Sequence, residues 1–375
     1  MKTKFYYFSC LIGIFLIASA YLHPDTTPQK PSVAAENEWV EKTIAKAMRK
    51  HNIPALSLGI VRDGELDFAK GFGHQDRSQQ QAVDAQSFYQ IGSDSKKMTA
   101  IIVKNLAKAG QLDLDKAIPE YFPKGLSEKT RQKLQPVTLR LLLQHRAGFP
   151  YRAPTNRRID GDPMLIPFTE TDVLHDLNVM ELSYEPGTKF DYSNFGYAVI
   201  GYICELATQK SFGELLQRYV SEAYGMDNTT VALNEAQQTK RVLPYRKDKR
   251  KRPSQPWQMG KMVAGGGIYS NVEDVGKLMS AQLKAYRAFH ESGQSESPIV
   301  LTKNLGEEKF EYGFGLMRLK DETGVFYGHG GDLDGYGSIY TFYPEQNKGL
   351  ILLTSSGGKW FRNLELELRT KLFAQ

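Results

Sequence analysis

The chain lacks several short motifs by which common enzyme classes are recognised. It has no G-x-S-x-G elbow, which argues against an α/β-hydrolase. His145 and His329 stand without an H-E-x-x-H pattern or cysteine partners, so we expect no metal site. The glycine-rich stretch Ala264–Ser270 has no Lys-Ser/Thr pair, so it does not indicate a phosphate-binding loop. We therefore expect no metal ion and no cofactor.

Cysteine is scarce as well. Only Cys10 and Cys204 occur among 375 residues, so a framework of disulfides is excluded. Cys204 lies in the apolar, periodic stretch AVIGYICELA and is expected in the core. With 41% hydrophobic and 24% charged residues, the composition is that of an ordinary globular protein. The fold must therefore be stabilised by a packed core.

Long apolar runs are absent except at the N-terminus, where the sequence is typical of a secretion signal. A basic start precedes the apolar run, and Ala18-Ser19-Ala20 fits a signal-peptidase site. We expect residues 1–20 to be a signal peptide; the alternative is an uncleaved anchor that attaches residues 5–22 to a membrane. Export with so little cysteine favours a bacterial periplasm or cell envelope. Residues 21–35 are Pro-rich and polar, which predicts a tether.

Positive charge is concentrated in one place. The formal net charge is +6, and the run RKDKRKR at Arg246–Arg252, with six basic residues and one acidic residue, supplies +5 of it. We interpret this run as a solvated loop; contact with an anionic polymer or lipid headgroups is the alternative. Because the remainder is almost neutral once the leader is removed, we expect no nucleic-acid partner.

Hydrophobic periodicity predicts an α+β fold for residues 36–375. A helix is expected from Glu36 to Lys50, followed by two strands joined by Asp63-Gly64, the strongest short hairpin signal. The middle of the chain is mostly helical, and the last third returns to strands before a closing helix. This order predicts an antiparallel sheet flanked by helices and built from both chain ends, residues 36–92 and 258–375. A mostly helical part, residues 93–257, is inserted between them.

Ser93 and Lys96 are the first candidates for chemistry. Their spacing of three places both on one face of a helix, so that the amine can take a proton from the hydroxyl. The alternative is that Ser93 caps the helix and Lys96 is a surface residue. Lys97 points about 100° away from Lys96 and is expected to be solvated.

A second candidate is the stretch Tyr192-Ser193-Asn194, which immediately precedes an apolar, periodic helix. A phenol beside a lysine ammonium would have a lowered pKa and could exchange a proton near neutral pH. The alternative for Tyr192 is an aromatic ring packed at the start of a helix.

A third candidate is GHGGDLDGYGS, from Gly328 to Ser338, in a strand-rich region. Five glycines in eleven residues indicate that the backbone approaches another element closely. The N–H groups of such a strand can stabilise an oxyanion. His329 alone is equally explained as a histidine with satisfied hydrogen bonds.

Six blocks in this order resemble the serine β-lactamase-like superfamily, in its branch of class C β-lactamases, DD-peptidases and esterases. The resemblance covers roughly residues 40 to 372. The blocks are IGSDSKKMTA, LLLQHRAGFP, YEPGTKFDYSNFGY, AGGGIYS, YGFGL and GHGGDLDGYGS.

The resemblance implies a role for each candidate. Ser93 would attack a carbonyl to form an acyl-enzyme, Lys96 would share its proton, and Tyr192 would act as base and then acid. The remaining residues would hold the substrate or its oxyanion. Substrate binding is implied for Asn194, His329, Gly330 and Gly331, and the oxyanion hole for the N–H groups of Ser93 and Asp332.

Two departures from the family pattern bear on the substrate. Gly330 stands where many relatives have a Thr or Ser that contacts a substrate carboxylate, and His329 replaces a lysine. We therefore expect a serine hydrolase acting on a small-molecule or peptide substrate through a peptide, amide or ester bond. The alternatives are a β-lactamase and a non-catalytic binding or sensor protein of the same fold.

Overall fold

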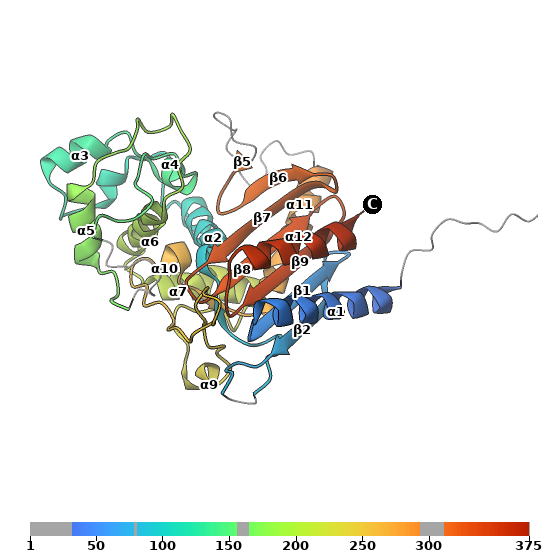
Figure 1. The fold of residues 1–375 in the computed structure, drawn as a ribbon. Coiled ribbons are helices and arrows are strands. Elements are labelled where there is room, and N and C mark those ends of the chain that lie inside the picture. The colour runs from blue at the N-terminus through green and yellow to red at the C-terminus, as the bar shows by residue number, and fades with distance from the viewer. Residues whose placement is uncertain (1–31, 79–80, 156–164, 293–310, 375) are drawn as a thin grey trace, which may run out of the picture.

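The computed structural model describes residues 32–78, 81–155, 165–292 and 311–374 (Figure 1). The longer helices are α1 (Val33–His51), α2 (Ser95–Lys108), α5 (Glu170–Val179), α6 (Asn194–Thr208), α11 (Val272–Ser292) and α12 (Lys359–Phe373). The shorter ones are α3 (Glu128–Leu134), α4 (Leu139–Leu143), α7 (Phe212–Leu216), α8 (Glu222–Tyr224), α9 (Glu235–Gln238) and α10 (Val263–Gly266). Three further short helical turns are η1 (Gly92–Asp94), η2 (Ile118–Tyr121) and η3 (Gln217–Ser221).

The main sheet joins the two ends of the chain, as predicted. Its order is β2-β1-β9-β8-β7-β6-β5, and every neighbouring pair is antiparallel. The strands are β1 (Ala55–Arg62), β2 (Glu65–Gly73), β5 (Glu311–Tyr312), β6 (Met317–Asp321), β7 (Gly324–Asp332), β8 (Gly337–Tyr343) and β9 (Lys348–Thr354). A separate two-stranded ladder pairs β3 (Tyr89–Gln90) with β4 (Tyr269–Ser270).

The hairpin expected at Asp63-Gly64 is confirmed. Both residues have positive φ, 51° and 80°, as the tight turn between twisted strands requires. The first helix is longer than expected, because it starts at Val33 rather than Glu36 and ends at His51. Ser32 caps it by accepting a hydrogen bond from the Ala35 N–H, so the last residues of the expected tether are helical.

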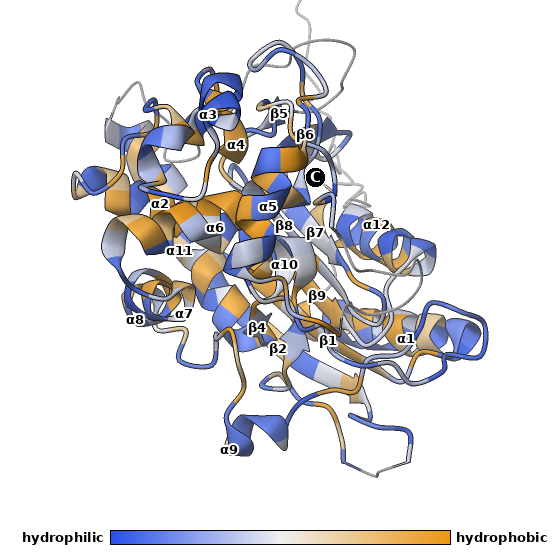
Figure 2. Cartoon of the chain, turned by 90° about the vertical axis from the view of Figure 1, so that its left-hand side faces the viewer, coloured by the Kyte–Doolittle hydropathy of each residue, from blue (hydrophilic) through white to orange (hydrophobic). Residues whose placement is uncertain are grey.

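Helices cover both faces of the sheet, which explains the position of the core. On one face α1 and α12 pack over β1 and β9 (Figure 1) and enclose a cluster that includes Ile44, Leu58, Leu352 and Leu364. The larger cluster lies on the other face and continues into the helical part of the chain. In Figure 2 the ribbon of α3 is mostly hydrophilic, whereas that of α6 carries hydrophobic segments.

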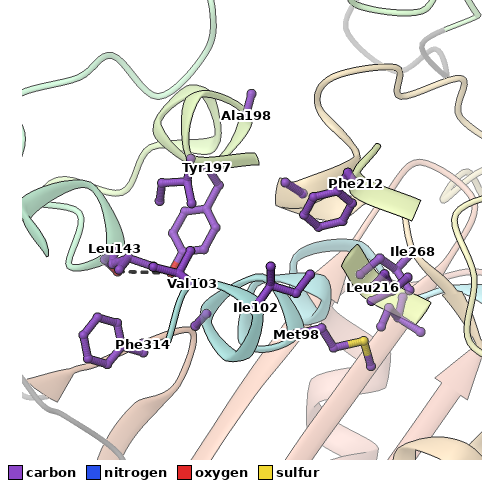
Figure 3. Close-up of a cluster of buried hydrophobic side chains, with 14 of the residues drawn as sticks. Met98, Ile102, Val103, Leu143, Tyr197, Ala198, Phe212, Leu216, Ile268 and Phe314 are labelled. Carbon is purple, nitrogen blue, oxygen red and sulfur yellow. Dashed lines mark hydrogen bonds between the residues drawn. The ribbon is translucent and has the colours of Figure 1, made fainter. Parts of the chain in front are cut away.

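Helix α2 is buried at the centre of the larger cluster. Met98, Ile102 and Val103 on α2 are fully buried, and the Tyr197 hydroxyl of α6 donates to the Leu143 carbonyl beside them (Figure 3). Its first six residues, 95–100, are all buried, so packing fixes the N-terminal end of the helix. Cys204 is fully buried on α6, as expected.

No helix within the described ranges is long and apolar enough to cross a membrane. The expected signal peptide or anchor lies outside the described residues and stays a prediction.

Candidate active site

Ser93 lies in η1, the turn that leads into α2. Gly92 before it has φ +55°, and a Cβ there would stand 3.0 Å from Gly331 Cα and 3.1 Å from Asp332 N. Only glycine lets this turn approach the end of β7 so closely. The alternative role of Ser93 as a helix cap is not seen, because Asp94 is the N-cap of α2 and no side-chain hydrogen bond caps that helix.

Lys96 is fully buried against Ser93. Its Nζ lies 3.2 Å from Ser93 Oγ, 2.8 Å from Asn194 Oδ1 and 2.6 Å from the carbonyl oxygen of Gly265. Burial lowers the pKa of Lys96 well below its ordinary value. A neutral amine has two N–H groups, which can donate hydrogen bonds to Asn194 Oδ1 and to the Gly265 carbonyl oxygen. Its one lone pair is then left to accept from the Ser93 hydroxyl. This arrangement suits a base that takes the serine proton.

Tyr192 adds a phenol beside the same two groups. Its ring centroid lies 4.9 Å from Lys96 Nζ, and its hydroxyl is buried without a hydrogen-bond partner among the described residues. The expectation of a lowered pKa is wrong: burial raises the pKa of Tyr192, and the nearby Ser93 hydroxyl only partly opposes this rise. The phenol is therefore protonated at rest and available as a proton donor.

Asn194 is positioned by the start of α6. Ser193 is the N-cap of this helix: its Oγ accepts from the Gly196 N–H at 2.9 Å and donates to the Pro150 carbonyl at 2.7 Å. As the first residue of the helix, Asn194 presents Oδ1 to Lys96. The stretch from Tyr192 to Asn194 thus places two candidate residues against the lysine.

His145 holds this stretch from behind, a role that the sequence analysis missed. Its Nδ1 accepts a hydrogen bond from the Ser193 N–H at 3.1 Å, and its carbonyl accepts one from the Asp191 N–H at 2.8 Å. The ring centroids of His145 and Tyr192 are 4.2 Å apart. Burial keeps the pKa of His145 well below its ordinary value. The block LLLQHRAGFP, from Leu141 to Pro150, was the available signal, because it is one of the six family-like blocks.

The third candidate region forms the end of β7. His329 is buried, its ring centroid lies 6.2 Å from that of Tyr192, and its Nδ1 lies 2.9 Å from the Gly330 carbonyl oxygen. Burial lowers the pKa of His329 to about 3, so the imidazole is neutral and Nδ1–H donates to that carbonyl. Gly331 packs directly on η1, since a Cβ there would lie 2.0 Å from the Ile91 carbonyl oxygen. Asp332 follows at the strand end.

A small pocket opens beside Ser93. Its lining includes Ser93, Asn194 and Asp332, together with Trp257 and Met259 from the segment that leads to α10. Three of the eight sequence-predicted site residues therefore line this pocket. Lys96 and Tyr192 lie beside Ser93 without lining it, and His329, Gly330 and Gly331 precede Asp332 on β7. No cluster of three or more metal-ligating side chains occurs in the part of the chain that the structure describes.

Part of the basic run reaches this cleft. Lys247 Nζ lies 2.6 Å from Asp332 Oδ1, and Arg362 of α12 lies 3.9 Å from the other oxygen. Lys251 is only 6% exposed. The expectation of a solvated loop is wrong for Lys251, which the fold covers, whereas Lys247 is exposed and forms a surface ion pair with Asp332.

The expectation that Lys97 is solvated is also wrong. It is 1% exposed, forms an ion pair with the equally buried Asp94, and its Nζ lies 3.8 Å from the centroid of the Tyr340 ring. Gly315, with φ +75°, packs on its backbone, where a Cβ would come within 2.4 Å. Burial raises the pKa of Asp94 and lowers the pKa of Lys97, while each charge opposes the shift of the other. The pair fixes the turn that carries Ser93.

Lys97→Met is expected to lower the free energy of unfolding by about 3–5 kcal/mol, because it leaves Asp94 buried without its cation. Chemical denaturation at pH 7 measures this loss. The loss should shrink as the pH falls, since a carboxyl group with a raised pKa becomes neutral on the acid side. The double variant Asp94→Asn/Lys97→Met should recover most of the stability, and a double variant as unstable as Lys97→Met would contradict the pairing.

The fold and the cleft together define the class of protein. A family model for beta-lactamases matches residues 40–372, so the chain belongs to the beta-lactamase family.

Individual relatives are distant. "Protein flp" of Staphylococcus aureus is 24% identical over 341 residues, which cover 89% of this chain and 66% of that protein, just under two thirds of its length. Among solved structures, the octameric penicillin-binding protein homologue from Pyrococcus abyssi is 26% identical and superposes with a TM-score of 0.74. The match covers 90% of this chain and 77% of the homologue's chain. The beta-lactamase/D-alanine carboxypeptidase from Pseudomonas syringae has a TM-score of 0.76 at 20% identity, covering 91% and 99%.

Proposed function

We propose that the chain is an exported serine hydrolase that acts through an acyl-enzyme on a peptide, amide or ester bond. The observation that carries this proposal is the environment of Lys96, whose amine is buried between Ser93 Oγ and the two oxygens that accept its N–H bonds. A buried amine of this kind serves to activate a serine, because burial lowers its pKa and so favours the free base.

The reaction follows from the positions of these groups. Ser93 Oγ attacks the substrate carbonyl carbon as its proton passes to Lys96 Nζ. The N–H groups of Ser93 and Asp332 stabilise the oxyanion that forms. As the tetrahedral species collapses, the bond to the leaving group breaks, and Tyr192 supplies the proton that the departing amine or alcohol needs, regaining one from Lys96. Water then attacks the acyl-enzyme, gives up a proton through the same pair, and releases the carboxylic acid and free Ser93.

The end of β7 favours this function over hydrolysis of β-lactams. Gly330 offers no hydroxyl and His329, with its pKa of about 3, offers no positive charge to a substrate carboxylate near neutral pH. A site without these two groups loses affinity for substrates that depend on them.

Treatment with a fluorophosphonate is expected to add one phosphonyl group to Ser93, detected by mass spectrometry of the digested protein. Ser93→Ala should carry no adduct at this position. Hydrolysis rates on nitrocefin, a D-Ala-D-Ala peptide and a p-nitrophenyl ester, measured side by side, identify the bond that is cleaved. Wild-type protein that stays unlabelled and hydrolyses none of the three would support the binding or sensor alternative instead.

A further inference from the structure

The pocket around Ser93 is too small to hold a whole substrate. Its volume is about 90 Å³, whereas sites for small molecules commonly measure about 300–1,000 Å³. The pocket therefore accommodates the scissile group and a few neighbouring atoms. The rest of any larger substrate must lie outside it.

A much larger groove begins at the wall of this pocket. It has a volume of about 720 Å³ and lies between α6, the start of α7 and the segments 231–241 and 255–261; we call it the α6–α7 groove. Trp257 and Met259 line both the groove and the catalytic pocket. The two spaces are thus neighbours, separated by one short segment of chain.

That segment is held firmly at both ends. The Gln90 side chain donates to the Trp257 carbonyl and accepts from the Trp257 N–H, each at 2.8 Å. At the other end the Lys261 N–H donates to the Phe168 carbonyl at 2.7 Å, and Lys261 Nζ lies 2.5 Å from Glu205 Oε2. A groove with fixed walls binds an extended ligand at a lower cost in conformational entropy.

The side chains of the groove suit a peptide. The largely buried side chains of Tyr202, Phe212 and Tyr269 form part of its wall, and the exposed side chains of Gln238 and Gln258 offer amides that can pair with peptide groups. Of the four charged side chains that line the groove, Lys261 and Glu205 form an ion pair, and among the described residues no ion pair is formed by Arg241 or by Glu170, which lies at the start of α5. A guanidinium in this position favours a carboxylate on the ligand.

We propose that the α6–α7 groove binds the extended part of a peptide substrate and that Arg241 selects peptides with an acidic side chain. This proposal rests on the proposed function, since it concerns the substrate of the same serine. It adds a specificity site that is separate from the catalytic residues.

Three benzyl thioesters test the proposal: acetyl-Glu-Ala-D-Ala, its matched Gln peptide, and plain benzyl thioacetate, which is too short to reach the groove. The quantity compared is kcat/KM on each peptide divided by that on the thioacetate in the same variant. We expect the wild-type ratio to be about tenfold higher for the Glu peptide than for the Gln peptide. This is the preference that one charged hydrogen bond between Arg241 and the glutamate side chain would give. Arg241→Ala should remove this preference.

Two further variants separate the groove from general effects. Val231→Trp fills the groove and should lower both peptide ratios about tenfold. Arg218→Ala removes an exposed cation outside the groove and should leave all ratios as in the wild type. Equal ratios for the two peptides in the wild type, a preference that survives Arg241→Ala, or hydrolysis of the thioacetate alone would each overturn the proposal. A protein that fails on all three substrates and takes no fluorophosphonate contradicts the proposed function itself.

Discussion

Lys96→Met is expected to slow the acylation of Ser93 by about 10²- to 10⁴-fold, the usual contribution of a positioned general base. Methionine fills most of the volume of the lysine side chain but cannot accept the serine proton. Its loss also leaves Asn194 Oδ1 and the Gly265 carbonyl without their donor. The rate of phosphonylation by a fluorophosphonate, followed by mass spectrometry over time, measures the effect on the serine directly.

The same residue determines the pH dependence of the wild type. Lys96 has a lowered pKa, so it is a free base above that pKa and becomes protonated as the pH falls through it. Activity is therefore expected to be lost on the acid side as the coupled pair of Lys96 and Tyr192 gains a proton. Because burial raises the pKa of Tyr192, the phenol stays protonated from neutral to mildly alkaline pH, and no matching loss is expected there.

A rate that is flat from mildly acidic to alkaline pH would contradict this assignment, as would a Lys96→Met variant that labels at the wild-type rate. Lys96→Arg provides the control, because its guanidinium keeps hydrogen-bond donors at the site but cannot accept the serine proton. It should be as slow as Lys96→Met. Thermal unfolding of both variants distinguishes loss of the base from loss of the fold.

The sequence predicted the sheet and the contact between Ser93 and Lys96 because both depend on short, regular spacings. Alternating strands and the Asp63-Gly64 turn determine the hairpin, and a spacing of three on a helix puts Ser93 beside Lys96. The order of six blocks then related Tyr192 to that pair. Each of these inferences needed only local geometry or a resemblance.

What the sequence did not predict depends on tertiary neighbours. The helical angle places Lys97 away from Lys96, but it cannot reveal that Tyr340 and Gly315 cover that side of the helix. The pKa of Tyr192 was predicted in the wrong direction because a neighbouring lysine was taken to decide it, whereas burial of the phenol itself is the largest effect. Burial is decided by the whole fold, so neither residue could be judged from its own segment.

The contact between β7 and η1 leads to the second large expected effect. Gly331→Ala would place a methyl group 2.0 Å from the Ile91 carbonyl oxygen and 2.5 Å from Ser338 Oγ. Because the first of these is backbone, the strand and the turn must move apart. The Asp332 N–H, which the proposed mechanism assigns to the oxyanion, would then move relative to η1. The loss of one oxyanion donor costs about 10²- to 10³-fold in kcat.

Kinetics on a p-nitrophenyl ester and thermal unfolding check this prediction together. Overpacking should also lower the free energy of unfolding by about 1–3 kcal/mol. Gly330→Ala is the matched comparison on the same strand, since its methyl group would meet only the Ser338 carbonyl oxygen, at 3.3 Å, and a much smaller loss is expected. Equal losses in the two variants, or full activity in Gly331→Ala, would show that the close packing of β7 on η1 does not position the oxyanion donor.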